Sequence, residues 1–345
     1  MGKIERVFLI ADFKDEFPQA SRIERRHWVK GFIRHGLDVQ RFSYRNVMEQ
    51  LAPIKHHRVA ARWGKPRADD ALATQMRHYH PDIVMILNMK LFDPATMTLI
   101  REAAPGAVVI GREEDPYPEA NPDRTAIARC CDWVLASSAG RYLEYYKQQG
   151  VPRCAFIPCP CDPDIHHPYP PDPRYQTDIF FAGKPGHDAG DADPDREEII
   201  SRLLKMPNAR VYGAFGVPRV EGIDCFIAMS NAKIALSINA VNDVSMYHSD
   251  RFFSSVSCGA FVLAKRVPDT ELLFEDGKHV RYFDTPDHFF ELVDYYLEHE
   301  DERKRIAAAG MEKGQREFDC TSMAGHVIDL VGTGSYRAPW ARILQ

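Results

Sequence analysis

The chain has 345 residues, of which 45% are hydrophobic and 27% charged, and this length favours two domains over a single core. Its net charge of −5, with acidic and basic residues interspersed, argues against an extended nucleic-acid surface. No apolar run reaches the roughly 18 residues of a membrane span, and the first residues lack the pattern of a signal peptide. We therefore expect a cytoplasmic protein whose eight cysteines are reduced thiols.

Short apolar runs alternate with helical patterns through the first half of the chain. Where the apolar residues repeat every three or four positions, we expect helices at 22–36, 68–80, 94–104, 123–131 and 140–150. The predicted strands around them are 6–11, 38–44, 82–87, 107–111, 133–138 and 153–158. This alternation predicts a parallel sheet with helices on both faces.

A proline-rich segment interrupts this alternation. Seven of the sixteen residues in "PCPCDPDIHHPYPPDP" (158–173) are proline, which makes the segment stiff and unable to pair in a sheet. We predict that it links a first domain, 1–157, to a second, 174–320, and that a C-terminal helix and tail, 321–345, could pack back on the first domain. Cys159 and Cys161 could clamp a metal, but no second Cys/His pair stands at a zinc-site spacing, so we expect none.

The alternation resumes in the second half. Strands are predicted at 177–183, 209–215, 233–239, 260–265 and 279–283, and helices at 195–206, 223–232, 249–259 and from 286 onwards. Thr285 followed by a proline is a strong signal for the start of the last of these helices. The predicted fold class is therefore α/β, with two doubly wound Rossmann-like domains facing across a cleft. Ligands of such sheets bind beyond the carboxyl ends of the strands, in the loops 12–21, 88–93, 112–119, 184–194, 213–221 and 240–250.

The stretch "HSDRFFSSVSCGAFVLAKR" (248–266) places Arg251 in the first turn of a predicted helix, where the helix dipole disfavours a positive charge. If the helix starts at Ser249, whose side chain can cap it, Asp250 complements the helix dipole but Arg251 does not, at a cost of up to about 1 kcal/mol. A bound anion would turn this cost into a stabilisation, because a helix N-terminus and an arginine both suit phosphate. The alternative is that Arg251 pairs with Asp250 or Asp243 and that the serines are small packing residues.

Other candidate donor-binding residues follow predicted strands of the second domain. Gly183 would let the backbone approach a phosphate, and Lys184 would add positive charge. Tyr212 and Gly213 end the next strand, where a nucleobase could stack, although Tyr212 could equally be a core residue. Three residues flank the proposed phosphate site and could order the donor: Asn239, Tyr247 and His248. His248 could equally be an ordinary surface histidine.

The segment "GREEDPYPE" (111–119) follows a strand of the first domain and holds the candidate catalytic carboxylates, Glu114 and Asp115, next to Glu113. Asp115 precedes a proline, which keeps it extended, and either candidate could act as a base if the cleft raised its pKa. Together with Arg251 they are the predicted catalytic residues. The alternative is a solvated acidic turn. Asp12, after the first strand, is a weaker candidate for the acceptor site.

The stretch from 249 to 318 resembles the C-terminal signature of GT-B glycosyltransferases, and most closely that of the CgeB-like proteins among the group 1 glycosyl transferases. The shared pattern is an arginine, a phenylalanine, a small-residue helix ending in Cys-Gly, an apolar strand and a downstream glutamate, here Glu271. "IPCPCDPDIHHP", "TDIFFAG" followed by Arg196, and "IALSIN" with Asn239 extend the match, which covers about 150–320. Residues 1–150 resemble the acceptor domain only loosely.

The resemblance implies a GT-B enzyme that transfers a sugar from a nucleotide-diphosphate sugar to a glycan, protein or small-molecule acceptor. It further implies metal-independent transfer with retention, no cofactor, and donor contacts from Ser249, Asp250, Arg251, Ser254 and Glu271. One departure is Ser254, which occupies the position of the family's ribose-binding glutamate and cannot span two hydroxyls with charge. An inactive nucleotide-sugar-binding scaffold and a GT-B sugar-nucleotide epimerase are therefore alternatives.

Overall fold

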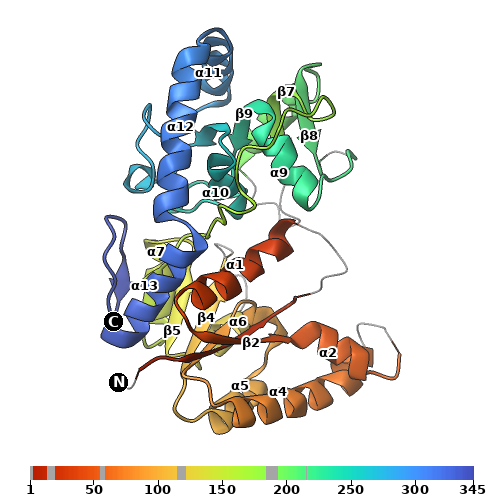
Figure 1. Ribbon diagram of the computed structural model, residues 1–345, viewed down its shortest axis with the longest axis vertical. Coiled ribbons are helices and arrows are strands. Elements are labelled where there is room, and N and C mark those ends of the chain that lie inside the picture. The colour runs from red at the N-terminus through yellow and green to blue at the C-terminus, as the bar shows by residue number, and fades with distance from the viewer. Residues whose placement is uncertain (1–2, 14–19, 55–58, 115–121, 184–192, 215) are drawn as a thin grey trace. The chain divides into compact units, whose positions relative to one another are not determined.

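The chain divides into two compact units in the computed structural model, which describes residues 3–13, 20–54, 59–114, 122–183, 193–214 and 216–345 (Figure 1). The first domain comprises Met1–Phe17, Glu24–Ile157 and Thr321–Gln345, and the second comprises Pro18–Ile23 and Pro158–Cys320. The proline-rich segment 158–173 thus groups with the second domain, and the C-terminal residues group with the first.

The first domain is built on a 7-stranded sheet in the order β12-β6-β5-β4-β3-β1-β2. All neighbouring strands are parallel except β12, which runs antiparallel to β6. Most residues of β1 and β3 to β6 are buried, as expected for strands covered by helices on both faces. The strands are β1 (Arg6–Ala11), β2 (Asp38–Ser43), β3 (Ile83–Ile86), β4 (Val108–Glu113), β5 (Trp133–Ala136), β6 (Cys154–Phe156) and β12 (Ile343–Leu344).

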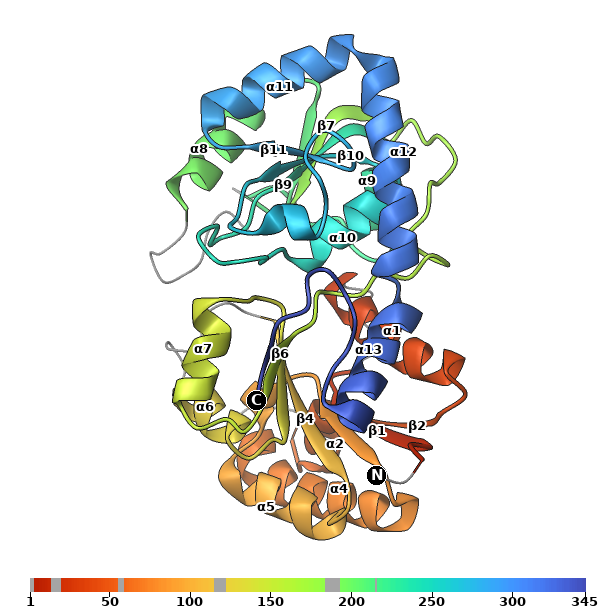
Figure 2. The same cartoon turned by 90° about the vertical axis from the view of Figure 1, so that its left-hand side faces the viewer.

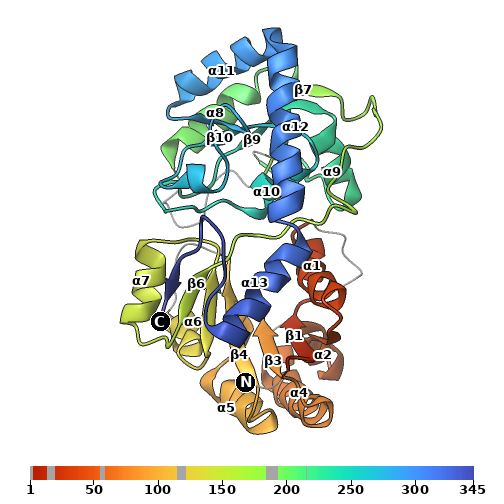
Figure 3. The ribbon, with the colours of Figure 1, turned by 60° about the vertical axis from the view of Figure 1, so that its left-hand side comes forward.

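Helices cover both faces of this sheet. The chain moves outward from β1 to β2 through α1 and back to β3 through α4, so right-handed crossovers put these two helices on opposite faces. Helix α13 lies beside α1 (Figure 3), where His35 Nε2 lies 2.8 Å from the carbonyl oxygen of Thr321. The helices are α1 (Ala20–Arg34), α2 (Tyr44–Leu51), α4 (Lys65–Tyr79), α5 (Pro94–Ala103), α6 (Pro122–Ala128), α7 (Arg141–Gln148) and α13 (Cys320–Thr333).

The second domain is built on a 5-stranded parallel sheet in the order β11-β10-β9-β7-β8. Helices α8 and α11 cover one face, where Arg202 Nη1 donates to Asp287 Oδ1 at 2.9 Å, and α9, α10 and α12 cover the other (Figure 2). The strands are β7 (Thr177–Ala182), β8 (Ala209–Tyr212), β9 (Ala232–Ser237), β10 (Phe261–Lys265) and β11 (Arg281–Phe283). The helices are α8 (Pro194–Leu203), α9 (Ile223–Ser230), α10 (Asp250–Ser257), α11 (Pro286–Glu298) and α12 (Glu300–Glu317).

Two helix starts in the second domain test the capping predictions. Thr285 is confirmed as the cap of α11, because its Oγ1 accepts from the backbone N–H of His288 at 3.2 Å. The expected side-chain cap of α10 is wrong: Ser249 stands at the capping position but makes no side-chain capping bond, and the helix begins at Asp250. The Ser249 hydroxyl instead lies 3.3 Å from Nη2 of Arg251.

Candidate functional site

The second domain has one point at which the direction of strand addition reverses. The chain leaves β7 on one side for β8 and returns on the other side to β9. Strands β7 and β9 adjoin this reversal point. The chain after β7, from Gly183, leads to α8, and the chain after β9, from Ile238, leads to α10. The N-termini of both helices therefore follow strands at the reversal point. In open parallel sheets this is where ligands bind.

Arg251 lies in the first turn of α10 and turns back toward the end of β7. Its Nη1 donates to the carbonyl oxygen of Ala182, and its guanidinium carbon lies 4.9 Å from the ring centre of Phe181. The Nε atom is buried and has no hydrogen-bond partner among the described residues. Burial lowers the pKa of Arg251, and the nearby negative charge of Asp250 opposes this shift. The charge of Arg251 is therefore poorly solvated.

The predicted alternative, an ion pair of Arg251 with Asp250 or Asp243, is absent from the described part of the chain. Asp250 Oδ1 instead accepts from the backbone N–H of Arg251 at 2.8 Å. Among the described residues, no carboxylate lies within ion-pair distance of this guanidinium at the end of the strand.

Arg196 is a second cation at the same point; it matches the family pattern but was not among the predicted site residues. It lies in the first turn of α8, only 5% exposed, and its Nη1 donates to the carbonyl oxygen of Ile238. Its guanidinium carbon lies 5.3 Å from the same Phe181 ring. The signal that could have revealed it is the one that revealed Arg251: an arginine in the first turn of a helix that follows a strand.

Gly183 makes room for both guanidinium groups. A Cβ at this position would clash with Nη1 of Arg251, and would lie 3.0 Å from Cζ of Phe181 and 3.2 Å from Nη2 of Arg196. Gly213 follows the neighbouring strand at a φ of +77°, and a Cβ there would lie 3.3 Å from the carbonyl oxygen of Gly183. The two predicted glycines therefore lie side by side at the ends of β7 and β8.

Two asparagines hold the starts of the two helices together. The side chain of Asn239 accepts from the backbone N–H of Ser249 at 3.2 Å and donates to the carbonyl oxygen of Tyr247 at 3.0 Å. The side chain of Asn242 donates to Asp193 Oδ2, at the cap of α8, at 2.9 Å, and to the carbonyl oxygen of Asn239 at 3.0 Å. Asn239 thus lies at the site, but as a residue that fixes the loop before α10.

His248 is a buried structural residue. Its Nε2 lies 2.6 Å from Oγ1 of Thr270, and its ring stacks on Phe252 with centres 4.1 Å apart. Burial lowers the pKa of His248 to about 3, so the ring is neutral near pH 7. Tyr212 is half-buried against Phe180, with ring centres 5.9 Å apart, and Ser254 is buried on α10.

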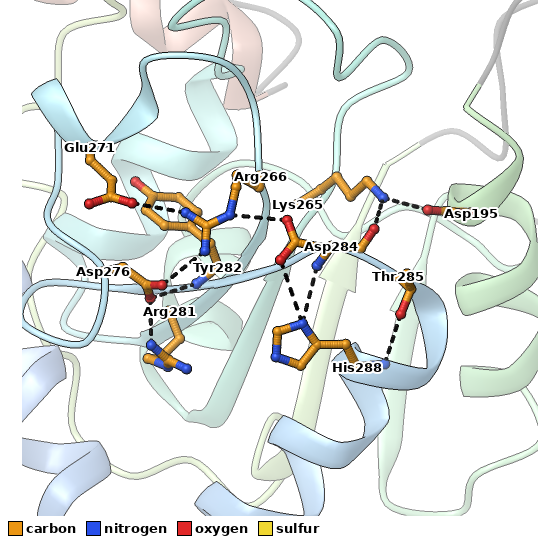
Figure 4. A network of polar contacts seen from close by, with 10 residues as sticks. All are labelled: Asp195, Lys265, Arg266, Glu271, Asp276, Arg281, Tyr282, Asp284, Thr285 and His288. Carbon is orange, nitrogen blue, oxygen red and sulfur yellow. Dashed lines mark hydrogen bonds and ion pairs between the residues drawn. The ribbon is translucent and has the colours of Figure 1, made fainter.

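Glu271 belongs to a network of ion pairs around Arg266, after β10 (Figure 4). Arg266 donates to Glu271 Oε1, Asp276 Oδ2 and Asp284 Oδ1, each at 3.0 Å. Tyr282 lies under the guanidinium, whose carbon is 5.2 Å from its ring centre. Glu271, which the resemblance implies as a donor contact, thus forms an ion pair with Arg266, and its side chain is 60% exposed.

The candidate base segment of the first domain is described only in part. Glu113 ends β4 as a buried residue, with Oε1 2.6 Å from Nη1 of Arg124 and Oε2 accepting from the hydroxyl of Tyr146 at 3.0 Å. Glu114 follows, and its carbonyl oxygen accepts from the hydroxyl of Ser137 at 2.9 Å. The predicted catalytic Asp115 and the predicted phosphate ligand Lys184 lie outside the described residues.

The described residues hold no group of three or more His, Cys, Asp or Glu side chains placed to bind a metal ion. None of the eight cysteines, all of which lie in the described ranges, forms a disulfide bond, and seven are buried. Among the helices that the structure describes, none combines the length and the apolar character that crossing a membrane requires.

Comparison with known proteins gives one family match. Residues 196–329 match the model of the Glycosyl transferase-like family, a range that begins at Arg196 and contains α10. No curated protein matches the sequence.

Solved structures resemble the whole chain at low sequence identity. HepE from Anabaena in complex with UDP-glucose has a TM-score of 0.60 at 11% identity, covering 95% of this chain and 99% of that one. Sucrose-phosphate synthase from Thermosynechococcus elongatus has a TM-score of 0.63 at 13% identity, covering 94% and 98%. An alpha-glucosyltransferase in complex with UDP and a 13-mer DNA has a TM-score of 0.64 at 10% identity, covering 95% and 100%. The chain therefore has the GT-B fold of glycosyltransferases, with two Rossmann-like domains.

Proposed function

We propose that the protein is a glycosyltransferase that takes its sugar from a nucleotide-diphosphate sugar bound by the second domain. The observation that carries this proposal is the meeting of Arg251 and Arg196 at Gly183, where each guanidinium carbon lies about 5 Å from the Phe181 ring. Two cations this close, at the starts of two helices, are stabilised by a ligand with two negative groups, such as a diphosphate.

The comparisons support the same donor. The family match covers most of this domain, from Arg196 onwards, and HepE and the alpha-glucosyltransferase were crystallised with UDP-glucose or UDP. Uridine diphosphate sugars are therefore the first donors to test. The CgeB-like group remains the finer assignment that the sequence pattern suggests.

The reaction breaks the bond between the anomeric carbon and the diphosphate oxygen, whose electron pair leaves with the diphosphate. The acceptor oxygen forms the new bond to the anomeric carbon, and its proton passes to the departing diphosphate. Arg251 and Arg196 would stabilise the charge that develops on the departing diphosphate, which is often a large part of catalysis. Because two guanidinium groups supply this charge, the proposal needs no metal. Retention at the anomeric carbon is proposed from the resemblance.

Calorimetric titration with UDP and with UDP-glucose tests the donor site. Arg251→Ala removes a charged donor worth about 1.5–3 kcal/mol, so the dissociation constant should rise about 10- to 100-fold. Arg202→Ala is the matched control, because Arg202 lies at the opposite end of α8 from Arg196 and pairs with Glu198 and Asp287. An unchanged dissociation constant in Arg251→Ala would refute the assigned role of the arginine.

Product analysis separates transfer from its alternatives. The protein, incubated with UDP-glucose and candidate acceptors, should release UDP and form a glycosylated product. Binding without transfer or hydrolysis would favour the scaffold alternative, and an epimerised donor in the absence of acceptor would favour the epimerase.

A further inference from the structure

The first domain has its own reversal point, and Asp12 lies there. Strand β1 has β2 on one side and β3 on the other, and Asp12 is the first residue after β1. The backbone N–H of Phe13 donates to Oγ of Ser43, at the end of β2, at 3.0 Å, which fixes the chain just beyond the strand. Asp12 therefore occupies the position at which a doubly wound sheet binds its ligand.

The carboxylate of Asp12 is buried and incompletely satisfied. The residue is 5% exposed, and its Oδ1 has no hydrogen-bond partner among the described residues. Oδ2 lies 3.8 Å from Nε of Arg45, which is an ion-pair distance but too long for a hydrogen bond. The main-chain carbonyl of Asp12 accepts from Nη1 of Arg25 at 2.9 Å, so a second guanidinium approaches the backbone and not the carboxylate.

The other buried carboxylates described in this domain are satisfied. Asp69 Oδ2 accepts from Nζ of Lys65 at 2.7 Å, and Glu113 Oε1 lies 2.6 Å from Nη1 of Arg124. A buried carboxylate oxygen without a donor is costly, so structures rarely keep one without a use. A carboxylate only accepts hydrogen bonds, and a ligand hydroxyl is a suitable donor.

Arg45 adds the second recognition element. It is the second residue of α2, its side chain is 46% exposed, and Nε is its nitrogen nearest to the Asp12 carboxylate. Its two terminal nitrogens make no hydrogen bond with the described residues, and an arginine fork of this kind suits a phosphate or carboxylate. The Asp12 carboxylate, a hydrogen-bond acceptor, and the Arg45 guanidinium, which can bind an anion, therefore lie close enough to contact one ligand.

We propose that Asp12 and Arg45 bind the acceptor, and that the acceptor is a hydroxyl-bearing anion of the sugar phosphate class. A hydroxyl of the acceptor donates to Oδ1 of Asp12, while its anionic group pairs with the terminal nitrogens of Arg45. This assignment deepens the proposed function, on which its description as an acceptor site rests.

The test measures binding of two probes, glucose 6-phosphate and glucose, by saturation-transfer NMR and calorimetry. The wild-type protein should bind glucose 6-phosphate more tightly than glucose. Asp12→Asn should weaken both by about tenfold or more, as expected for loss of a charged acceptor. Arg45→Ala should remove the preference for the phosphate. Asp38→Asn, which changes an exposed carboxylate at the start of β2, is the matched control and should bind both probes like the wild type.

Two measurements on the same samples keep the outcomes separate. The melting temperature of Asp12→Asn should equal or exceed that of the wild type, because a buried charge with one unsatisfied oxygen is removed. A large drop would show a structural role and overturn the proposal. Equal probe binding by Asp12→Asn and wild type, no wild-type binding of glucose 6-phosphate, or equal affinity for both probes would also overturn it. UDP binding should be unchanged in Asp12→Asn. If no variant bound UDP but sugar binding still depended on Asp12, the donor proposal would fail and the Asp12 site would stand.

Discussion

Replacing Gly183 by alanine adds a single methyl group at the meeting point of the two arginines. The backbone at Gly183 is not in the left-handed region, so alanine introduces no backbone strain and the effect is steric. The new Cβ would overlap Nη1 of Arg251 and lie 3.0 Å from Cζ of Phe181. The guanidinium of Arg251 must therefore move away from the carbonyl oxygen of Ala182.

Two magnitudes follow from this displacement. Overpacking of a filled site typically costs about 1–3 kcal/mol, which should lower the free energy of unfolding of the second domain by that amount. Misplacing one charged donor should weaken UDP binding about 10- to 100-fold, which calorimetry detects directly. Gly106→Ala is the control, because a Cβ at Gly106 meets no atom within 4 Å and both quantities should stay at their wild-type values.

The double variant tests the reasoning most sharply. If the methyl group acts by displacing Arg251, then Gly183→Ala in an Arg251→Ala background should reduce UDP affinity little further, because the clashing side chain is gone. Additive losses in the double variant, or normal UDP binding by Gly183→Ala alone, would refute the steric account of the site.

Two further predictions concern stability. Because burial lowers the pKa of His248 to about 3, only the unfolded chain gains a proton there as the pH falls below about 6.5; the free energy of unfolding should drop by about 2 kcal/mol between pH 7 and pH 5, and urea titrations of His248→Gln should lack this drop. Trp340 is 1% exposed and packs edge-on against Phe156 with ring centres 5.8 Å apart, so Trp340→Ala should destabilise the first domain by about 3–5 kcal/mol in guanidinium unfolding, and a loss below about 1 kcal/mol would contradict this packing.

The sequence predicted most of the fold because its elements have strong local signals. Most predicted strands of the two sheets are apolar runs followed by a periodic helix, and the structure confirms the order of these elements. Helix α2 and strand β12 were missed. Strand β12 has only two residues, Ile343 and Leu344, and exists through pairing with β6, about 190 residues earlier in the chain, which local patterns cannot reveal.

The candidate site was predictable where a residue conflicts with its local structure. Arg251 stood out as a cation in a first helical turn, and Gly183 as a glycine after a strand. The partners of the site residues were not predictable from local patterns. Arg251 donates to the carbonyl oxygen of Ala182, which lies in a distant segment, and Glu271 forms an ion pair with Arg266. The empty hydrogen-bonding position on Asp12 is a property of the folded environment and has no counterpart in sequence spacing.

The C-terminal residues bear on how the protein is made. Tyr336 donates its hydroxyl to the carbonyl oxygen of Phe156, and the backbone N–H of Phe156 donates to the carbonyl oxygen of Arg342 at 2.9 Å, so the edge of the first sheet is completed by residues that follow the second domain in the chain. On the ribosome, residues 158–320 emerge before this edge can close. The second domain can therefore finish folding while the first, although begun earlier, still exposes strand β6. A nascent chain that has emerged from the ribosome only as far as Gly334 should carry a complete second domain beside an unfinished first one.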